Sequence, residues 1–355
     1  MSDRIQTAVI GVTGYAGAEL ARLLLRHPRL KGVPPVFAGR LDEKDATRGG
    51  VPLTQIHPQL GDNNGAGALR LQSFSWELLA EHGVKVLFLA TPHEQSRVWV
   101  PQALERGLRV IDLSAAWRLS EVSHRAVYAF EDEGSQTASA VQSQAVYGMP
   151  ELHRATIAGA QIVANPGCYA TTIILPLRPL VAADILDLSH GIVADAKSGV
   201  SGAGKAVTAK THYMYAADNL SAYGVFAHRH TGELLEQIGL AGDQIIFTPH
   251  LLPIPRGILA TIYVRFRTPQ TRESITHIYK NFFAGSPMVR LYDGMLPQIQ
   301  YSVRTNYADI GFQLSADGRR AVIVSCLDNL LKGASGQAVQ NLNVMLGYGE
   351  AEGLE

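Results

Sequence analysis

The sequence has little that would mark a secreted, membrane or nucleic-acid-binding protein. Its 355 residues include only two cysteines, too few for a disulfide scaffold and compatible with a reducing compartment. The 31 basic and 31 acidic residues cancel, which disfavours binding to nucleic acid or to an anionic membrane. No apolar run approaches the roughly 20 residues that span a bilayer, and no signal-peptide pattern precedes the first strand-like segment. We therefore expect a cytoplasmic protein without nucleic-acid or membrane partners.

A chain of 355 residues favours two domains over one. The first domain opens with an apolar strand pattern at 7–10, a glycine-rich turn at 11–17 and a helix pattern at 19–26. Such a turn begins a dinucleotide-binding unit, because glycines let the backbone approach a pyrophosphate whose charge the helix N-terminus attracts. The spacing is G-x-x-G-x-x-G, not the usual G-x-G-x-x-G, so an ordinary tight turn is the alternative. The candidate cofactor residues are Gly11, Thr13, Gly14, Tyr15 and Gly17.

Arg40 bears on the choice of cofactor. The second strand is expected to end near residue 37, and NAD sites usually place an acid there, whereas this chain has an arginine before the first acid, Asp42. An arginine favours the extra phosphate of NADP, and a solvated loop arginine is the alternative. The apolar run at 84–90 is typical of a central parallel strand, so Pro92 lies at the carboxyl end, where ligands usually bind.

A further strand at 109–113 leads to a hydroxyl, Ser114, and a cation, Arg118. Both suit a carboxylate or phosphate beyond a strand end, although Arg118 could equally form a surface ion pair. The polar region 131–144 is interpreted as a loop without a legible function.

The segment Asn-Pro-Gly-Cys-Tyr at 165–169 is the strongest local signal. It lies between a β-prone stretch at 161–164 and a helix-compatible stretch at 170–175, so we expect strand, tight turn and helix, with Cys168 at the helix start. Helix N-termini lower a thiol pKa and favour a nucleophile, whereas a buried cysteine is otherwise a small hydrophobe. Pro176 and Pro179 predict that this helix kinks or stops early.

The second half of the chain predicts a domain with a mixed sheet, on which two subunits can pack. Strand patterns occur at 192–196, 244–248, 258–266 and 321–325. The cationic segment 197–205 is interpreted as a flexible loop that could hold an anionic substrate or simply be mobile. His228 and His230, followed by Glu233, could perform acid–base work or bind a metal. A last helix is expected at 334–346.

A dinucleotide fold, a cysteine at a helix start and a histidine pair together suggest hydride transfer through a thioester. The thiolate would attack an activated acyl carbon while backbone N–H groups near Cys168 hold the oxyanion. No metal is required, because a nicotinamide would supply the reducing power.

Six segments occur in an order that resembles the N-acetyl-gamma-glutamyl-phosphate reductase family. They are Gly-Val-Thr-Gly-Tyr-Ala-Gly at 11–17, Asp-Leu-Ser-Ala at 112–115, Tyr-Gly-Met-Pro-Glu-Leu at 147–152, the cysteine turn at 165–169, His-Arg-His-Thr at 228–231 and Asp-Asn-Leu-Leu-Lys-Gly at 328–333. The resemblance extends from about residue 7 to 347. It implies NADPH-dependent reduction of the small-molecule acyl phosphate N-acetyl-glutamyl 5-phosphate to the semialdehyde, with release of phosphate.

The resemblance also implies an α/β architecture and a set of roles. Residues 1–164 and 328–355 would form an NADP-binding Rossmann domain, and 165–327 an α+β catalytic and oligomerisation domain of a homodimer or homotetramer. Cys168 would be the nucleophile, and the pair His228 and His230, oriented by Glu233, the acid–base group. From the spacing we expect an extended segment in which both histidines point the same way, and we favour His228 as the acid–base residue. Asn329 would lie by the nicotinamide, and the candidate substrate-binding residues are Ser114, Arg118, Asn165 and Lys197.

Three alternatives remain open on the sequence. Aspartate-semialdehyde dehydrogenase shares the architecture and the thioester chemistry, and the lysine-pathway reductase acts on a carrier-protein-bound aminoadipyl phosphate. The third alternative is a non-catalytic NADP-binding sensor. The Asn-Pro-Gly-Cys-Tyr turn favours the N-acetyl-gamma-glutamyl-phosphate reductase family, which the resemblance assigns to arginine biosynthesis, over both relatives. A sensor would need neither Cys168 nor a histidine pair.

Overall fold

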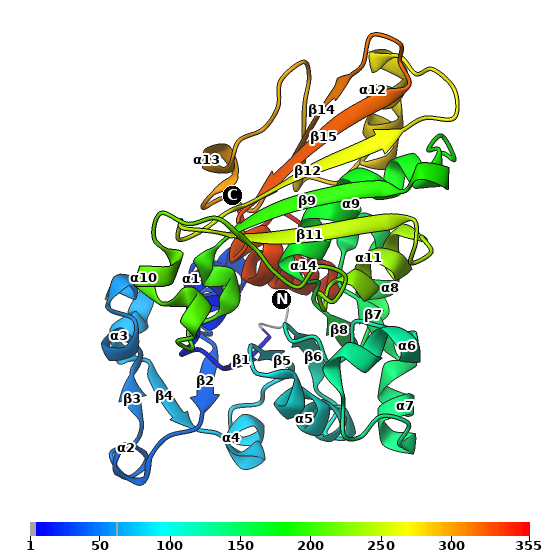
Figure 1. The fold of residues 1–355 in the computed structure, drawn as a ribbon. Coiled ribbons are helices and arrows are strands. Elements are labelled where there is room, and N and C mark those ends of the chain that lie inside the picture. The colour runs from blue at the N-terminus through cyan, green and yellow to red at the C-terminus, as the bar shows by residue number, and fades with distance from the viewer. Residues whose placement is uncertain (1–4, 62) are drawn as a thin grey trace. The chain divides into compact units, whose positions relative to one another are not determined.

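Two β-sheets organise the chain, each in its own structural unit (Figure 1). The computed structural model describes residues 5–61 and 63–355. Unit 1 comprises Met1–Arg118, Phe130–Asn165 and Ser335–Glu355, and unit 2 comprises Leu119–Ala129 and Pro166–Ala334. Within the described residues, no helix is long and apolar enough to cross a membrane.

The sheet of unit 1 is parallel except where β3 meets β4, and its strand order over the described residues is β3-β4-β2-β1-β5-β6-β8-β7. Its central strands are short and fully buried, as expected where helices cover both faces of a parallel sheet. The strands are β1 (Thr7–Ile10), β2 (Val36–Gly39), β3 (Val51–Pro52), β4 (Arg70–Ser73), β5 (Val86–Leu89), β6 (Arg109–Asp112), β7 (Ala145–Tyr147) and β8 (Ile162–Ala164). The α-helices are α1 (Tyr15–Arg26), α2 (Glu43–Thr47), α3 (Leu53–Ile56), α4 (Trp76–Glu81), α5 (His93–Glu105), α7 (Gln136–Gln142), α8 (Pro150–Gly159) and α14 (Gly336–Leu346).

The C-terminal helix α14 belongs to unit 1 and packs against α8 and α1. Its apolar face is buried, as the pattern of Ala338, Leu342 and Met345 predicts. The side-chain amides of Gln337 and Asn341 are also buried, and both donate to the carbonyl of Gly148, at 2.9 and 2.8 Å. These bonds satisfy buried polar groups and fix α14 to the 147–152 segment.

The sheet of unit 2 is mixed, with the order β10-β11-β9-β12-β15-β14-β13 over the described residues. Helices α9, α11 and α12 cover one face, and the strands alternate buried residues on that face with more exposed ones on the other (Figure 1). The strands are β9 (Ile192–Gly199), β10 (Ser221–Ala222), β11 (Ile245–Leu252), β12 (Ile258–Arg265), β13 (Val289–Tyr292), β14 (Ala308–Leu314) and β15 (Arg320–Leu327). The α-helices are α6 (Val122–Arg125), α9 (Cys168–Ala182), α10 (Tyr213–Ala216), α11 (Thr231–Ile238), α12 (Arg272–Phe282) and α13 (Ile299–Ser302).

Three local predictions are wrong. The polar region 131–144 contains α7, which Ser135 caps by accepting from the N–H of Ala138. Helix α9 does not stop early, because burial of nearly all its side chains outweighs the roughly 3 kcal/mol that each internal proline costs. The segment from residue 197 does not begin as a loop, because β9 continues to Gly199 by pairing with β11 and β12.

Asn165 and two longer segments lie in a different unit from the one that the sequence suggested. Residues 119–129 join unit 2, where Ser120 and His124 bond Glu236 of α11. Residues 328–334 also join unit 2, because the carboxylate of Asp328 is tied to loops of that unit.

Candidate active site

Cys168 is the first residue of α9, directly after the strand β8 and its turn, as the sequence predicts. Gly167 is the N-cap of this helix. A Cβ atom on Gly167 would lie 2.5 Å from Nε2 of His230 and 2.8 Å from Oε1 of Glu233. Glycine is therefore required here by space, and the close approach places His230 beside the residue that precedes the thiol.

Glu233 links α11 to the backbone next to Cys168. It is fully buried in the first turn of α11, and its Oε2 accepts a hydrogen bond from the N–H of Gly167 at 2.9 Å. Its Oε1 lies 4.0 Å from Nε2 of His230, so the two side chains interact electrostatically at a distance longer than a hydrogen bond. Cys168, His230 and Glu233 thus form one cluster in unit 2.

His228 lies between two turn segments, and His230 has helical backbone angles, φ −82° and ψ −6°, so the predicted extended segment is wrong. Its Nδ1 accepts a hydrogen bond from the backbone N–H of His230 at 3.1 Å. Its ring packs edge-on against those of Tyr169, Tyr223 and Phe247. Burial, helped by the charge of Arg229, lowers the pKa of His228 to about 4. At neutral pH this imidazole is uncharged and a weak base, which removes the basis for preferring His228 over His230.

Two further residues contact this cluster and were not assigned a role from sequence. A Cβ atom on Gly333 would lie 2.7 Å from Cβ of Cys168, so the motif at 328–333 packs directly on the thiol-bearing residue. The hydroxyl of Tyr169 donates to the carbonyl of His250 at 2.7 Å, and burial raises the pKa of this tyrosine. The only sequence signal for either was its presence in a family motif.

Lys197 and His250 share one carboxylate. They are paired residues on the neighbouring strands β9 and β11. Nζ of Lys197 lies 2.9 Å from Oδ2 of Asp195, and Nδ1 of His250 lies 3.0 Å from Oδ1 of the same residue. Lys197 therefore sits in a strand with a carboxylate partner, not in the mobile loop that the sequence suggested.

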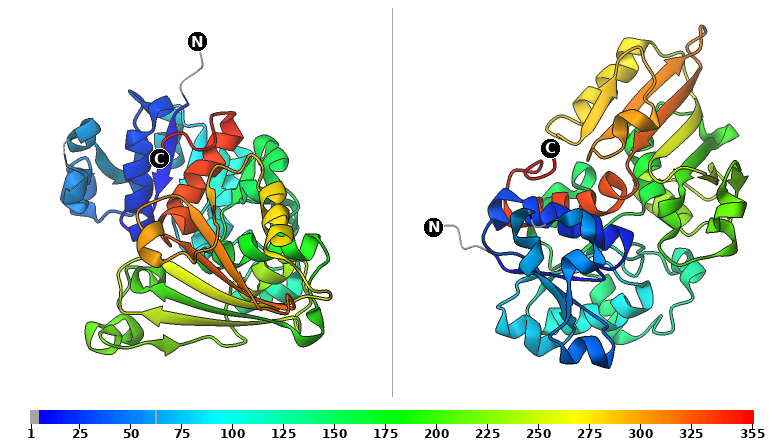
Figure 2. Two further views of the ribbon diagram at one scale, coloured as in Figure 1. Left: turned by 90° about the horizontal axis from the view of Figure 1, so that it is seen from above. Right: turned by 90° about the vertical axis from the view of Figure 1, so that its left-hand side faces the viewer.

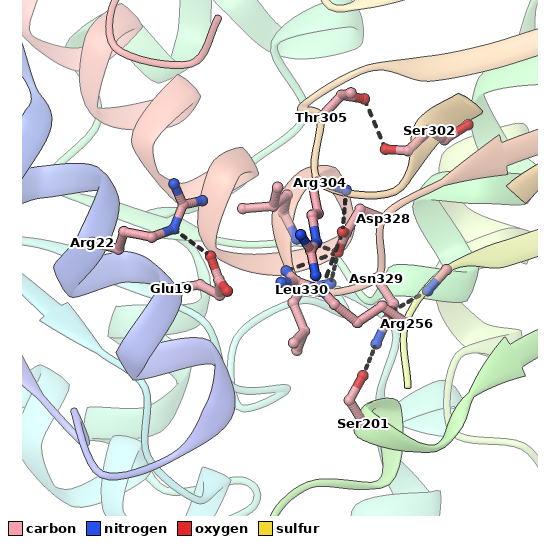
Figure 3. A network of polar contacts seen from close by, with 12 residues as sticks. Glu19, Arg22, Ser201, Arg256, Ser302, Arg304, Thr305, Asp328, Asn329 and Leu330 are labelled. Atoms are coloured by element: carbon pink, nitrogen blue, oxygen red, sulfur yellow. Dashed lines mark hydrogen bonds and ion pairs between the residues drawn. The ribbon is translucent and has the colours of Figure 1, made fainter. Parts of the chain in front are cut away.

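Asp328 and Asn329 hold several loops of unit 2 together (Figure 3). The carboxylate of Asp328 is buried, accepts from the N–H groups of Arg304 and Leu330, and forms an ion pair with Arg256. The amide of Asn329 accepts from the N–H of Gly257 at 2.8 Å and donates to the hydroxyl of Ser201 at 2.9 Å. These two bonds connect loops of unit 2, and the place of Asn329 at the nicotinamide stays a prediction.

The glycine-rich turn of unit 1 follows β1 and leads into α1, whose N-cap is Gly14. Gly11 has a φ of 94°, and a Cβ there would lie 2.3 Å from the carbonyl oxygen of Ala90. A Cβ on Gly17 would lie 2.2 Å from the carbonyl oxygen of Gly11. These glycines allow the turn to pack closely on β5 and α1, while the side chains of Thr13 and Tyr15 are exposed.

Arg40 and Pro92 lie at the same edge of the sheet as this turn. Arg40 is exposed and directly follows β2, which pairs in parallel with β1, so both strands end at one edge. Pro92 is the N-cap of α5, just beyond β5 on the other side of β1. The arrangement fits a dinucleotide, because close-packed glycines, a helix N-terminus and a cation converge on one edge of a parallel sheet.

The other candidate substrate residues have structural partners in unit 1. The hydroxyl of Ser114 donates to the buried carboxylate of Asp112 at 2.7 Å, and burial raises the pKa of that carboxyl. The guanidinium of Arg118 donates to the carbonyls of Asn165 and Leu113, at 2.7 and 2.8 Å. The side-chain oxygen of Asn165 accepts from Asn341 at 3.0 Å. These bonds connect the segments that follow β6 and β8, so Ser114, Arg118 and Asn165 have a structural role in addition to any contact with substrate.

Comparison with family models divides the chain in two. Residues 6–160 match the semialdehyde dehydrogenase NAD binding domain, and residues 168–329 match the semialdehyde dehydrogenase dimerisation domain.

Curated relatives named N-acetyl-gamma-glutamyl-phosphate reductase align along nearly the whole chain. The protein from Pelotomaculum thermopropionicum is 39% identical, with 99% of this chain and 97% of that protein covered. The protein from Dehalococcoides mccartyi is 41% identical, with 99% and 98% covered. The protein from Methanococcus maripaludis is 39% identical, with 98% and 97% covered.

Solved structures of aspartate semialdehyde dehydrogenases share the fold. The Vibrio cholerae enzyme II complexed with ASA aligns with a TM-score of 0.70 at 18% identity, covering 98% of this chain and 99% of that chain. The Candida albicans enzyme with NADP aligns with a TM-score of 0.66 at 15% identity, covering 96% and 98%. At such identities the likeness confirms the predicted fold class alone.

Proposed function

The chain belongs to the N-acetyl-gamma-glutamyl-phosphate reductase family, and on this premise we propose that it reduces N-acetyl-glutamyl 5-phosphate to N-acetyl-glutamate 5-semialdehyde with NADPH, releasing phosphate. The observation that carries the mechanism is Cys168 at the start of α9, next to a glycine against which His230 and Glu233 pack. The resemblance stated from the sequence is confirmed by relatives near 40% identity over almost the full length.

Cys168 acts as the nucleophile in this proposal. Its thiolate attacks the acyl carbon, the bond from that carbon to the phosphate oxygen breaks, and phosphate leaves an acyl thioester. The first N–H groups of α9 have no carbonyl partner inside the helix, so they can stabilise the oxyanion. When bound, NADPH supplies the hydride that reduces this acyl group. The carbon–sulfur bond then breaks, which restores Cys168 and releases the aldehyde.

His230 is the proposed acid–base residue, and Glu233 positions it. The imidazole lies against Gly167 and holds the proton that the oxygen of the reduced acyl group gains and loses. Glu233 stays bonded to the Gly167 N–H, so it fixes the relation between α11 and the helix start of α9. His228 accepts a hydrogen bond from the backbone N–H of His230, and its ring packs edge-on against the ring of His230 at one side of the site.

The reverse reaction tests the proposed activity. The purified chain is given N-acetyl-glutamate 5-semialdehyde, NADP and phosphate, and NADPH formation is followed by its absorbance. A phosphate-dependent rise supports the reductase, and the same assay with aspartate semialdehyde measures the activity of the related dehydrogenases. A chain that binds NADP but forms no NADPH under these conditions would be a sensor instead.

Arg40 is proposed to set the preference for NADP over NAD. A charge-assisted contact between an arginine and the 2′-phosphate is worth roughly 1.5–3 kcal/mol. Arg40→Ala should therefore raise the Michaelis constant for NADPH about ten-fold or more and leave that for NADH nearly unchanged. Arg48→Ala is the matched control, because Arg48 is also exposed and lies just after α2 in the same connection. Equal weakening of both cofactors would make Arg40 structural.

A second copy of the chain is the proposed partner of unit 2. Ile246, Val193 and Tyr263 are register partners across β11, β9 and β12, and they are 41%, 37% and 47% exposed. The alternation of buried and exposed residues puts them on the face of the sheet opposite α9. The three strands β9, β11 and β12 are coloured green to yellow in Figure 2. Such an apolar row supports packing of sheet on sheet, in agreement with the dimerisation model that matches 168–329.

Introducing charge into that row should disrupt the assembly. Val193→Arg is expected to shift the protein from a dimer or tetramer toward smaller species, measured by sedimentation velocity, because the arginine would be desolvated between two apolar faces. Val98→Arg, at an exposed valine of α5 in unit 1, is the control and should leave the mass unchanged. An unaltered mass for Val193→Arg would place the subunit contact elsewhere.

The proposed location is the cytoplasm. Both cysteines are free thiols, and a reducing compartment keeps thiols in the reduced form that the proposed nucleophile needs.

A further inference from the structure

A buried histidine supports the glycine-rich turn from outside it. His57 follows α3, in the connection of residues 40–69 between β2 and β4, and it is only 7% exposed. Its Nε2 lies 2.7 Å from the carbonyl oxygen of Val12, the residue after Gly11. Val12 itself is fully buried. Nothing in the sequence pattern distinguishes His57 from an ordinary loop histidine.

The partners of the ring determine its tautomer. A carbonyl oxygen only accepts hydrogen bonds, so Nε2 of His57 must carry the hydrogen and donate to Val12. On the other side of the ring, Nδ1 lies 3.5 Å from the side-chain nitrogen of Gln59, which is a donor. His57 is therefore a bridge that holds one particular peptide group of the turn.

That peptide group has a consequence for anion binding. In a trans peptide the carbonyl oxygen and the following N–H point in opposite directions. Fixing the Val12 carbonyl on His57 therefore directs the Thr13 N–H to the opposite side of the turn and keeps a carbonyl oxygen from turning toward a bound anion. The glycine contacts at Gly11 and Gly17 fix the position of the turn, and the His57 bond fixes the orientation of its peptide.

We propose that His57 is a positioning residue for the cofactor diphosphate, and this inference rests on the proposed use of NADPH. The connection that begins with Arg40 at the edge of the sheet thus returns through His57 to the glycine-rich turn. Arg40 would distinguish NADPH from NADH, whereas His57 would support the binding of both, because both carry the same diphosphate.

A pair of amide substitutions tests the role of His57 in the full-length protein. The amide nitrogen of glutamine can occupy the place of Nε2, whereas that of asparagine is too short to reach Val12. One lost hydrogen bond is worth about 1 kcal/mol, so His57→Asn should raise the dissociation constants of NADPH and NADH about five-fold alike. The turnover number at saturating NADPH should stay unchanged, and His57→Gln should remain within about two-fold of the wild type.

The control is His82→Asn, because His82 also bonds a backbone carbonyl, that of Leu78 in α4, but is exposed and remote in sequence from the turn. Its cofactor affinities should equal those of the wild type. Binding of NADPH to the wild-type protein tests the proposed function. The ratio of the dissociation constants of the His57 variants to that of the wild type tests the role of His57. Equal affinities for His57→Asn and the wild type would overturn the inference, as would equal losses in the asparagine and glutamine variants. A loss confined to NADPH would also overturn it, since that would assign His57 to the 2′-phosphate.

Discussion

Replacing Cys168 by serine should lower turnover by roughly 10⁴-fold or more while NADPH binding stays at the wild-type level. The serine hydroxyl remains protonated at neutral pH where a thiol is partly ionised, so the attack on the acyl carbon is lost. Apart from Asn329, the cofactor residues proposed above lie in unit 1, whereas Cys168 lies in unit 2. Serine also has nearly the size of cysteine, so the substitution should leave the affinity for NADPH unchanged. Turnover is measured in both directions, and binding by the change in NADPH fluorescence.

Cys326, the second cysteine, is the control for the reactivity of the Cys168 thiol. It is fully buried in β15, and burial together with the charge of Asp309 raises its pKa. Iodoacetamide should therefore modify Cys168 rapidly and Cys326 slowly, and Cys326→Ala should lower stability with little effect on turnover. A Cys168→Ser enzyme that turns over at close to the normal rate would end the thioester mechanism.

Replacing His230 by asparagine should lower the turnover number by about 10²–10⁴-fold at saturating substrate, the usual range for loss of general acid–base help. The reason is its location, since its Nε2 packs against Gly167 and faces Glu233. Glu233→Gln should have a smaller effect, because the amide oxygen can still accept from the Gly167 N–H while the charge beside His230 is lost.

His228 is the matched control for His230, only two residues away. With its pKa near 4, it is neutral at pH 7 and cannot be the group whose titration affects turnover near neutral pH. His228→Asn should keep an acceptor for the His230 N–H and retain most of the turnover number. If His228→Asn shows the large loss and His230→Asn does not, the assignment must be reversed, although the role of Cys168 would stand.

The lowered pKa of His228 also predicts a dependence of stability on pH. Between pH 6.5 and about 4 the unfolded chain binds a proton at His228 that the folded chain does not. Folding stability should therefore fall as the pH decreases through this window. The loss should be smaller in His228→Asn, measured as the difference in urea unfolding between pH 7 and pH 4.5.

Local patterns in the sequence were enough to predict the glycine-rich turn, the strand–turn–helix around Cys168 and the mixed sheet of the second half. They were also enough to identify the family. Those features follow from short-range causes: apolar periods set the strands and helices, and glycine and proline set the turns. The six motifs required no knowledge of contacts, because each is a contiguous segment.

Only the tertiary structure decided which histidine contacts Gly167, why α9 continues through two prolines and what Lys197, Asn329 and His57 bond. The bonds of Asn329 to Ser201 and Gly257 and of His57 to Val12 join residues 45 to 128 positions apart. A lowered pKa at His228 likewise depends on the rings packed around it. Such contacts arise from the packing of distant segments, and neither periodicity nor spacing in one sequence encodes which segments meet.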